Sequence, residues 1–173
     1  NAEIAVLKDA GAPPENKRQA LIFLVHFMAD VHQPLHCADE VTRAGRSDRG
    51  GSLKWLTREN AKPGDKKFTL HSFWDSILRL SKEERGPGPR ALADKLEKNI
   101  AAKDTSAWTR GDMVTAAVLE SHRIAKESIY PDYHRNYGRP VGKAYQDKYR
   151  PVAYERLEMA GIRLAALLND SLK

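Results

Sequence analysis

The stretch LVHFMADVHQPLH, residues 24–36, combines the pattern of a buried helix with several ionisable side chains. Apolar residues cover every side of the segment from position 21 to 25, and they are followed by His26, Asp30, His32 and His36. An isolated buried charge is costly, and proteins keep one mainly where it is paired or bound to a metal. The stretch therefore predicts a helix that carries a polar site into an apolar setting.

The periodicity of the remaining sequence predicts one mainly helical domain over residues 1–173. Pro34 should end the first strong helix, GPGP at 86–89 should separate two helices, and another helix should end before Pro131. Residues 130–140 are aromatic and are expected to be irregular. The expected helices span residues 14–33, 70–80, 90–101, 105–129 and 142–170.

The region between the first two helices predicts the departure from helix. Residues 37–52 are polar and glycine-rich, which indicates a surface loop. LKWL (53–56) and KKFTL (66–70) are then expected to pair as a short hairpin. The last helix should carry a one-sided apolar stripe of Leu157, Ala160, Gly161, Leu164, Leu167 and Leu168. The fold class is therefore all-α with a loop or short β-hairpin excursion.

Composition narrows the classes of function. Hydrophobic residues make up 41% and charged residues 30% of the 173 residues, so the chain is globular rather than disordered. No apolar run approaches the ~20 residues of a membrane span, and no signal-peptide pattern is present. A net charge of +6 fits an anionic partner such as a nucleic acid, although many basic proteins bind none. Cys37 is the only cysteine, which excludes an internal disulfide.

Two His-x-x-x-Asp pairs supply candidate metal ligands. His26 and Asp30 are four residues apart, as are His71 and Asp75 in LHSFWD, so each pair shares one helix face. His36 follows Pro34, which turns the chain so that a side chain there can point back toward the same region. Either pair alone is weak evidence for a ligand. Together, three imidazoles and two carboxylates predict a zinc site.

Other polar and aromatic residues have both a structural and a functional interpretation. His122 and His134 are expected to be surface or packing residues, and Trp74 should pack behind the metal helix. Trp55 either stacks on a base or packs in the hairpin, and Cys37 should point away from the metal. A basic group is either a solvated face or a phosphate-steering surface; it comprises Lys54, Arg58, Lys62, Lys66 and Lys67.

Three motifs in this order, VHFMADVHQPLH, DRGGS (48–52) and LHSFWD, make the chain resemble the S1/P1 nuclease family of zinc-dependent endonucleases. The C-terminal RLEMAGIRLAALLN (156–169) is similar to that family's last helix. The resemblance implies a mainly helical phospholipase C/P1 nuclease-like fold and hydrolysis of single-stranded DNA and RNA to 5′-phosphorylated products. It also implies 3′-nucleotidase activity on nucleotides and a secreted or periplasmic location.

The resemblance assigns roles to the candidate ligands. The family holds up to three zinc ions, and the ligands of one of them match His36, His71 and Asp75. A carboxylate that bridges the other two zincs matches Asp30, which makes Asp30 the expected catalytic residue. A further ligand of that pair matches His26.

Substrate contacts are expected beside these ligands, at Gly51, Ser52 and Lys54. The family usually has Asn where this chain has Ser52, which leaves the base preference open. His32 matches a family residue outside the ligand set, in agreement with helix geometry, because a residue two positions after Asp30 points to the opposite side.

The sequence departs from the family in the ligands of the two-zinc pair. In the family, an N-terminal Trp and further His and Asp residues provide ligands to this pair, and these residues have no counterpart here. This chain therefore holds the full ligand set of only one zinc. The resemblance therefore implies the C-terminal two-thirds of the domain, completed by a missing N-terminal segment. The alternatives are a relative without activity, a zinc phospholipase C-like phosphodiesterase, and a non-catalytic zinc-stabilised helical binding domain.

Overall fold

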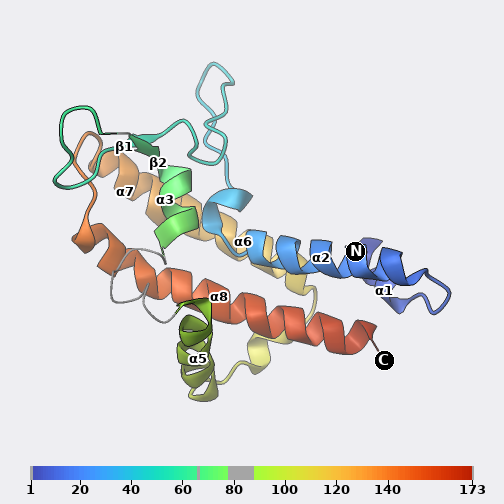
Figure 1. Ribbon diagram of the computed structural model, residues 1–173. Helices are drawn as coiled ribbons and strands as arrows, with labels where there is room; N and C mark the ends of the chain where they lie inside the picture. The colour runs from blue at the N-terminus through green and yellow to red at the C-terminus, as the bar shows by residue number, and fades with distance from the viewer. Residues whose placement is uncertain (1, 66, 78–87, 173) are drawn as a thin grey trace.

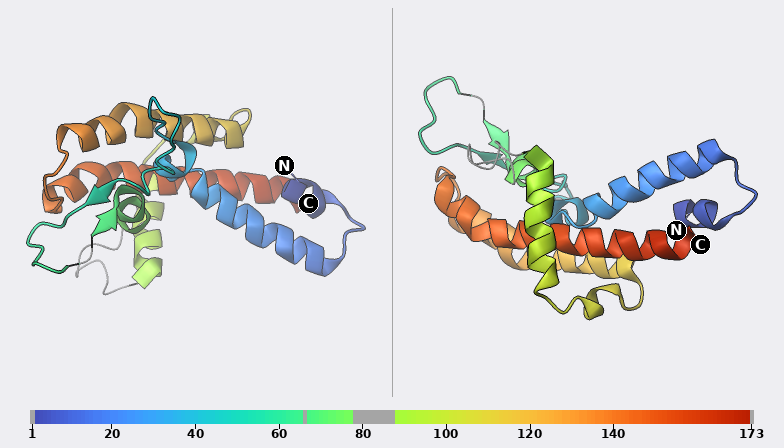
Figure 2. Two further views of the ribbon diagram at one scale, coloured as in Figure 1. Left: turned by 90° about the horizontal axis from the view of Figure 1, so that it is seen from above. Right: turned by 60° about the horizontal axis from the view of Figure 1, so that its bottom comes forward.

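The computed structural model describes residues 2–65, 67–77 and 88–172, most of them helical. In chain order the elements are α1 (Ala2–Lys8), α2 (Pro14–Asp30), the 3-10 turn η1 (Pro34–Cys37), β1 (Trp55–Leu56), β2 (Phe68–Thr69), α3 (Leu70–Ser76), α5 (Gly88–Ala101), the 3-10 turn η3 (Ser106–Thr109), α6 (Met113–Ile124), the π-helical turn η4 (Ala125–Ile129), α7 (Tyr130–Arg135) and α8 (Lys143–Ser171). Figure 1 shows α8 running the length of the molecule, with α2 beside one part of it and α5 crossing it. The rod formed by α6, η4 and α7 follows α8 closely (Figure 2). The mainly helical fold class is confirmed.

The N-terminal hairpin of α1 and α2 packs on the C-terminal half of α8. Leu7, Ala20, Leu24 and Met28 form its buried core, against which Leu164, Leu167 and Leu168 of α8 pack. The three leucines thus occupy the predicted apolar stripe of α8. Gly161 of that stripe is exposed, however, and the charged residues Arg156, Glu158 and Arg163 of the same helix are buried.

The expectation that α2 is buried on every side is wrong for the described residues. Only one stripe of α2 faces the core, because the helix contacts α1 and α8 on one side. Its other large apolar side chains are 37–48% exposed: Leu21, Ile22, Phe23, Val25 and Phe27. The surface of α2 therefore carries an apolar face, which includes the stacked rings of Phe23 and Phe27.

The end of α2 lies at Asp30, three residues before the predicted end. Pro34 begins η1, and the residue before a proline is disfavoured in helical conformation. Gln33 accordingly adopts an extended conformation, and its side-chain oxygen accepts a hydrogen bond from the Leu35 amide at 2.5 Å. This turn changes the chain direction between the two predicted ligands Asp30 and His36.

The predicted hairpin is confirmed as the antiparallel pair β1–β2, with Trp55 opposite Thr69 and Leu56 opposite Phe68. α3 follows β2 directly and begins with a capping box in which the side chains of Thr69 and Ser72 bond each other's backbone amides. Such caps satisfy amide groups that the first helical turn leaves unpaired. Residues 78–80 of the predicted helix and residues 86–87 of the predicted break lie outside the described residues.

A second core lies beneath the hairpin and α3. Leu35, Leu70, Trp74 and Ile129 are among its most buried members. The loop before the hairpin closes on this core, so its DRGG end is not the surface loop that composition predicts: Asp48, Gly50 and Gly51 are buried. The difference arises because the loop backbone packs on the apolar core, although the loop itself has few apolar side chains.

The helix predicted over residues 105–129 differs from the prediction at both ends. It begins at Met113 rather than 105, because Asp112 caps it by accepting hydrogen bonds from the amides of Val114 and Thr115. It also continues through η4 into α7, so residues 130–135 are helical rather than irregular. Pro131 is tolerated because it directly follows the π-helical turn η4, where the regular α-helical hydrogen bonding is already interrupted.

The two remaining helices begin close to their predicted positions. α5 begins at Gly88, inside the predicted GPGP break, and α8 spans Lys143–Ser171 with Pro151 in its interior. Within the part of the chain that the structure describes, no helix combines the length and the hydropathy required to cross a membrane.

Candidate metal centre

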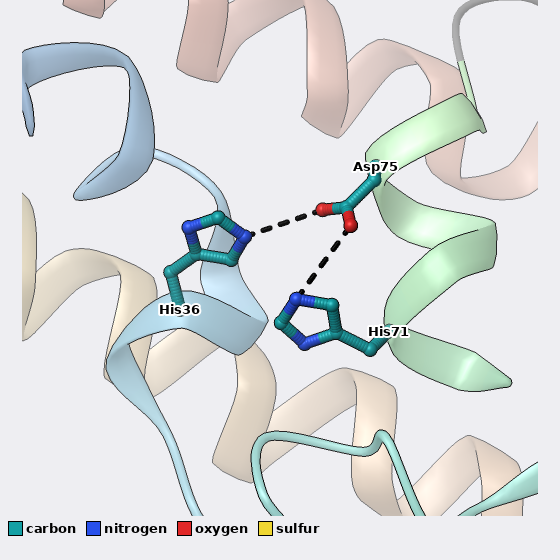
Figure 3. Close-up of side chains that lie close together, drawn as sticks. All are labelled: His36, His71 and Asp75. Carbon is teal, nitrogen blue, oxygen red and sulfur yellow. Dashed lines mark hydrogen bonds and ion pairs between the residues drawn. The ribbon is translucent and has the colours of Figure 1, made fainter. Parts of the chain in front are cut away.

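The cluster His36, His71 and Asp75 is built from two short elements that the chain brings together. His36 lies on η1, whereas His71 and Asp75 lie one turn apart on α3. Figure 3 shows the two imidazole rings and the carboxylate pointing toward one another. Their potential ligand atoms all lie within 4.8 Å of one another. The structure thus brings together three of the five ligands that the sequence predicts.

The distances in this cluster suit a tetrahedral ion. His36 Nε2 lies 3.2 Å from Asp75 Oδ1, and His71 Nε2 lies 3.6 Å from Asp75 Oδ2. Zinc bonds of about 2.1 Å in tetrahedral geometry place neighbouring ligand atoms about 3.4 Å apart. The rings of His36 and His71 are stacked with centroids 4.9 Å apart. Two imidazoles and one carboxylate at this spacing could therefore hold a metal ion such as zinc.

Backbone and side-chain partners orient these ligands. His71 Nδ1 lies 2.8 Å from the Gly50 carbonyl oxygen, which can only accept, so Nδ1 carries the hydrogen and Nε2 presents its lone pair. Gln33 donates from Nε2 to Asp75 Oδ1 at 2.9 Å. Partners of this kind fix the tautomer and direction of metal ligands. Gly50 has φ +60, and a Cβ there would overlap the Leu35 carbonyl oxygen, so the loop needs glycine at this point.

The other predicted pair lies beside the cluster. His26 Nε2 lies 3.1 Å from Asp30 Oδ2, and Asp30 Oδ1 lies 3.5 Å from His36 Nδ1. The side chain of His26 is 67% exposed. Among residues 2–65, 67–77 and 88–172, His36, His71 and Asp75 are the one group of three or more potential ligands that converges. The described residues therefore add no third ligand to His26 and Asp30.

An open cavity of about 420 Å³ adjoins the cluster and is lined by Asp30, His36 and His71 together with Arg49 and Gly50. Arg49 is exposed and has φ +55, which is uncommon for a residue with a side chain. Its guanidinium is a cation of the kind that binds phosphate groups. The cavity thus joins the ligand cluster to a positively charged rim.

The predicted substrate contacts occupy different settings. Gly51 is a buried residue of the loop with φ +82, and Ser52 is half-buried. Lys54 is only 13% exposed in its side chain, forms an ion pair with Glu40 and lies 3.6 Å from Asp48. The charge of Lys54 is thus neutralised within the loop, unlike the solvated or phosphate-steering surface expected of the basic group.

The other singled-out residues have mainly structural contacts. Trp74 is 3% exposed and packs edge-on to Tyr149, as expected for a buttress of α3. Trp55 is 58% exposed, so hairpin packing does not cover it. The thiol of Cys37 lies 3.4 Å from the Val31 carbonyl oxygen, outside the cluster. His134 lies 2.8 Å from Glu40, on the surface.

His32 and His122 bond backbone rather than the metal cluster. His32 is 2% exposed and donates from Nδ1 to the Met28 carbonyl at 2.7 Å. Burial, aided by the charges of Arg156 and Arg163, lowers the pKa of His32 to about 4. His122 donates from Nδ1 to the Cys37 carbonyl at 3.0 Å. His32 is therefore a neutral structural residue, and His122 supports η1 from α6.

Sequence reasoning missed the groups that orient the metal ligands or support the segment between them. Gln33 belongs to the HQPLH motif but gave no ligand signal, and the Gly50 carbonyl is a backbone atom without a side-chain pattern. Glu120, Arg156 and Arg163 form an ion cluster beneath residues 31–33. Charged positions within the apolar pattern of α6 and α8 were the signal available for them.

Comparison with known proteins identifies a family and several relatives that this chain resembles. A model described as S1/P1 nuclease matches residues 1–173. Endonuclease 2 of Arabidopsis thaliana is 34% identical over 164 residues, which cover 89% of this chain and 52% of the relative. Endonuclease 1 of the same plant is 33% identical over 168 residues, 89% of this chain and 50% of the relative. Nuclease S1 of Aspergillus oryzae is 28% identical over 169 residues, 87% of this chain and 53% of the relative. The chain spans about half the length of the curated relatives it matches.

Proposed function

This chain belongs to the S1/P1 nuclease family. We propose that it forms part of a zinc-dependent endonuclease that hydrolyses single-stranded DNA or RNA to 5′-phosphorylated products. The proposal includes 3′-nucleotidase activity on nucleotides. The observation that carries it is the convergence of His36, His71 and Asp75 at zinc-ligand spacing. The named relatives are nucleases and endonucleases, which supports the same reaction class.

The three residues of the cluster would hold one zinc ion, with the Gly50 carbonyl and Gln33 keeping His71 and Asp75 in place. When bound, zinc supplies Lewis-acid chemistry, which lowers the pKa of water and stabilises negative charge on a phosphate. His36 and His71 both line the cavity beside the cluster. A phosphodiester can approach from the cavity.

His26 and Asp30 are proposed as ligands of the further zinc ions, with Asp30 as the bridging catalytic carboxylate. Asp30 Oδ1 lies 3.5 Å from His36, which supports a metal pair directly beside the first ion. The proposal also requires another segment of the same domain, so that residues 1–173 are its C-terminal part. The exposed apolar face of α2 and the half-length coverage of the relatives support this requirement.

The substrate proposal follows the cavity beside the cluster. Arg49 at its rim favours a phosphate-containing ligand, and the buried glycines Gly50 and Gly51 keep the loop backbone close to His71. Ser52 lies next to them and is proposed to contact the base. The net charge of +6 favours a nucleic acid over an uncharged substrate. We place the protein outside the cytoplasm, secreted or periplasmic, on family resemblance.

The test compares zinc content and hydrolysis in the wild-type chain and in two histidine variants. His71→Ala removes a cluster ligand, whereas His134→Ala removes an exposed histidine bound to Glu40. Zinc per chain is measured by elemental analysis, and hydrolysis is measured on a single-stranded oligonucleotide and on adenosine 3′-monophosphate. We expect His71→Ala, and not His134→Ala, to lose about one zinc per chain, and to lose hydrolysis when the chain is supplied with the further segment that the proposal requires.

Three results would contradict the proposal. Zinc-loaded chain that hydrolyses neither substrate, even with the upstream segment of its gene restored, would favour the zinc-stabilised binding domain. Hydrolysis of phosphatidylcholine in place of nucleic acid would favour the phospholipase C-like reaction. A wild-type chain that takes up no zinc would refute the metal centre itself.

A further inference from the structure

Three residues, Val31, His32 and Gln33, link α2 to η1 and thereby join Asp30 to His36. Side chains from two distant helices bind the backbone of this linker. Ser121 of α6 donates to the Val31 carbonyl at 2.6 Å. Arg156 of α8 donates from Nε to the His32 carbonyl at 3.3 Å. The direction of the linker therefore depends on contacts 90 and 124 residues away in sequence.

An ion cluster of two buried arginines and the half-buried Glu120, 26% exposed, holds these donors. Glu120 Oε2 accepts hydrogen bonds from Arg156 Nη1 at 2.6 Å and from Arg163 Nη1 at 2.8 Å, and Glu120 Oε1 accepts a second one from Arg163 at 2.8 Å. The side chains of Arg156 and Arg163 are 4% and 2% exposed. Bidentate pairing of this kind fixes a guanidinium in both position and orientation.

Each arginine also contacts the linker or its neighbour directly. Arg163 Nη1 lies 3.0 Å from Nε2 of the neutral His32, whose other nitrogen bonds the last turn of α2. Arg156 Nη2 donates at 2.9 Å to both Ser121 Oγ and the Ala117 carbonyl. The cluster thus reaches the segment between the two ligands through Arg156 and Arg163 at His32, while Arg163 also donates from Nε to the Trp108 carbonyl of η3.

We infer that Glu120, Arg156 and Arg163 are positioning residues of the metal centre, which set the placement of Asp30 and His36 through the linker 31–33. The inference rests on the proposed zinc function, because it concerns how tightly and in which geometry the metal is held. The hydrogen bonds to the Val31 and His32 carbonyls satisfy backbone acceptors and, at the same time, fix the direction of the chain between the two ligands. Apolar side chains of similar volume often stabilise a buried site equally well.

The test uses a matched pair of glutamates. Glu120→Gln keeps the shape of the side chain and removes the charge that orders both arginines. Glu158→Gln makes the same change at a residue of α8 that is 1% exposed and binds Asn99 and Lys103, toward α5 and away from the linker. Both variants remove a carboxylate from an ion pair, at a side chain 26% exposed in Glu120 and 1% exposed in Glu158, and only Glu120 is connected to the metal ligands.

Two measurements separate positioning from stability. Zinc affinity of the full chain is obtained by competition with a chelator, and the visible absorption of the cobalt(II)-loaded chain reports ligand geometry. We expect Glu120→Gln to weaken zinc binding about 10-fold or more and to shift the cobalt bands, as for partners that orient metal ligands. Glu158→Gln should leave both within twofold and without a band shift, while lowering the thermal midpoint.

Ser121→Ala is the second variant, in case Glu120→Gln does not fold, and it is held to the same criteria. Zinc affinity and cobalt bands unchanged in the folded variant, despite a lower thermal midpoint, would overturn the positioning role and leave the metal centre intact. A wild-type chain that binds neither zinc nor cobalt would overturn the metal centre as well. The two failures are therefore distinguishable.

Discussion

Replacing Gly50 by alanine should weaken metal binding much more than the same replacement at Gly45, a glycine with a comparable backbone conformation. Gly50 has φ +60, and its carbonyl accepts the hydrogen bond that directs His71. An added Cβ would overlap the Leu35 carbonyl oxygen and would lie 3.3 Å from His71 Nδ1. Gly45 is the matched control, since it has φ +72 and nothing within 4 Å of an added Cβ.

The two substitutions share one cost and differ in another. Alanine in the left-handed region costs about 1 kcal/mol, and both variants should show this loss in the free energy of unfolding. Relief of the overlap at Gly50 requires a backbone shift of roughly 0.5 Å, which takes a 2.8 Å hydrogen bond to the edge of its useful range. Loss of such a ligand-orienting partner lowers metal affinity about 10–100-fold.

The assay is chelator competition for zinc with each alanine variant, combined with denaturant unfolding of the metal-free chain. Gly50→Ala should bind zinc at least about tenfold more weakly than Gly45→Ala, which corresponds to about 1.4 kcal/mol of binding free energy. Equal zinc affinities in the two variants would refute the role of the Gly50 carbonyl in directing His71.

Three further outcomes test the fold and its charges. Leu70→Ala, at a side chain 1% exposed, should lower the free energy of unfolding by about 2–5 kcal/mol, whereas Leu53→Ala, at 54% exposure, should change it by less than about 0.5. Thr69→Ala should cost about 1 kcal/mol through the lost cap of α3, and an unchanged denaturation midpoint would contradict that role. Burial raises the pKa of Glu120, but hydrogen bonds from Arg163 and Arg156 outweigh it and lower the pKa to about 2. Its stabilisation, about 1 kcal/mol after solvent screening of this half-buried group, should be complete above about pH 4.5 and lost toward pH 2, so the unfolding free energies of metal-free wild type and Glu120→Gln should converge on acidification.

Local patterns predicted the parts of the site that lie within one element. His71 and Asp75 share a face because four residues are slightly more than one helical turn, and they do converge on one side of α3. The hairpin followed from two short β-prone runs, and β1 pairs with β2 as expected. These predictions succeeded because backbone geometry within a few residues determines them.

The same local reasoning failed at Pro131 and in the loop before the hairpin. Pro131 indicated a helix end, yet the helix continues through it, because the π-helical turn η4 directly before it already interrupts the α-helical hydrogen bonding. Composition predicted a surface loop at 37–52, yet its glycine end is buried against Leu35 and Leu70. Packing against Leu35 and Leu70 decides the second case, and it involves residues outside the loop.

The sequence by itself determined the helical class, the ligand types and the spacing of each pair, because residue chemistry and helical periodicity are local properties. Only the tertiary structure decided that His36 meets His71 and Asp75, and that Glu120, Arg156 and Arg163 stand behind the linker that joins Asp30 to His36. Those arrangements depend on which helix faces pack together. The free energy that selects that packing is summed over the whole core, so no single stretch of sequence contains it.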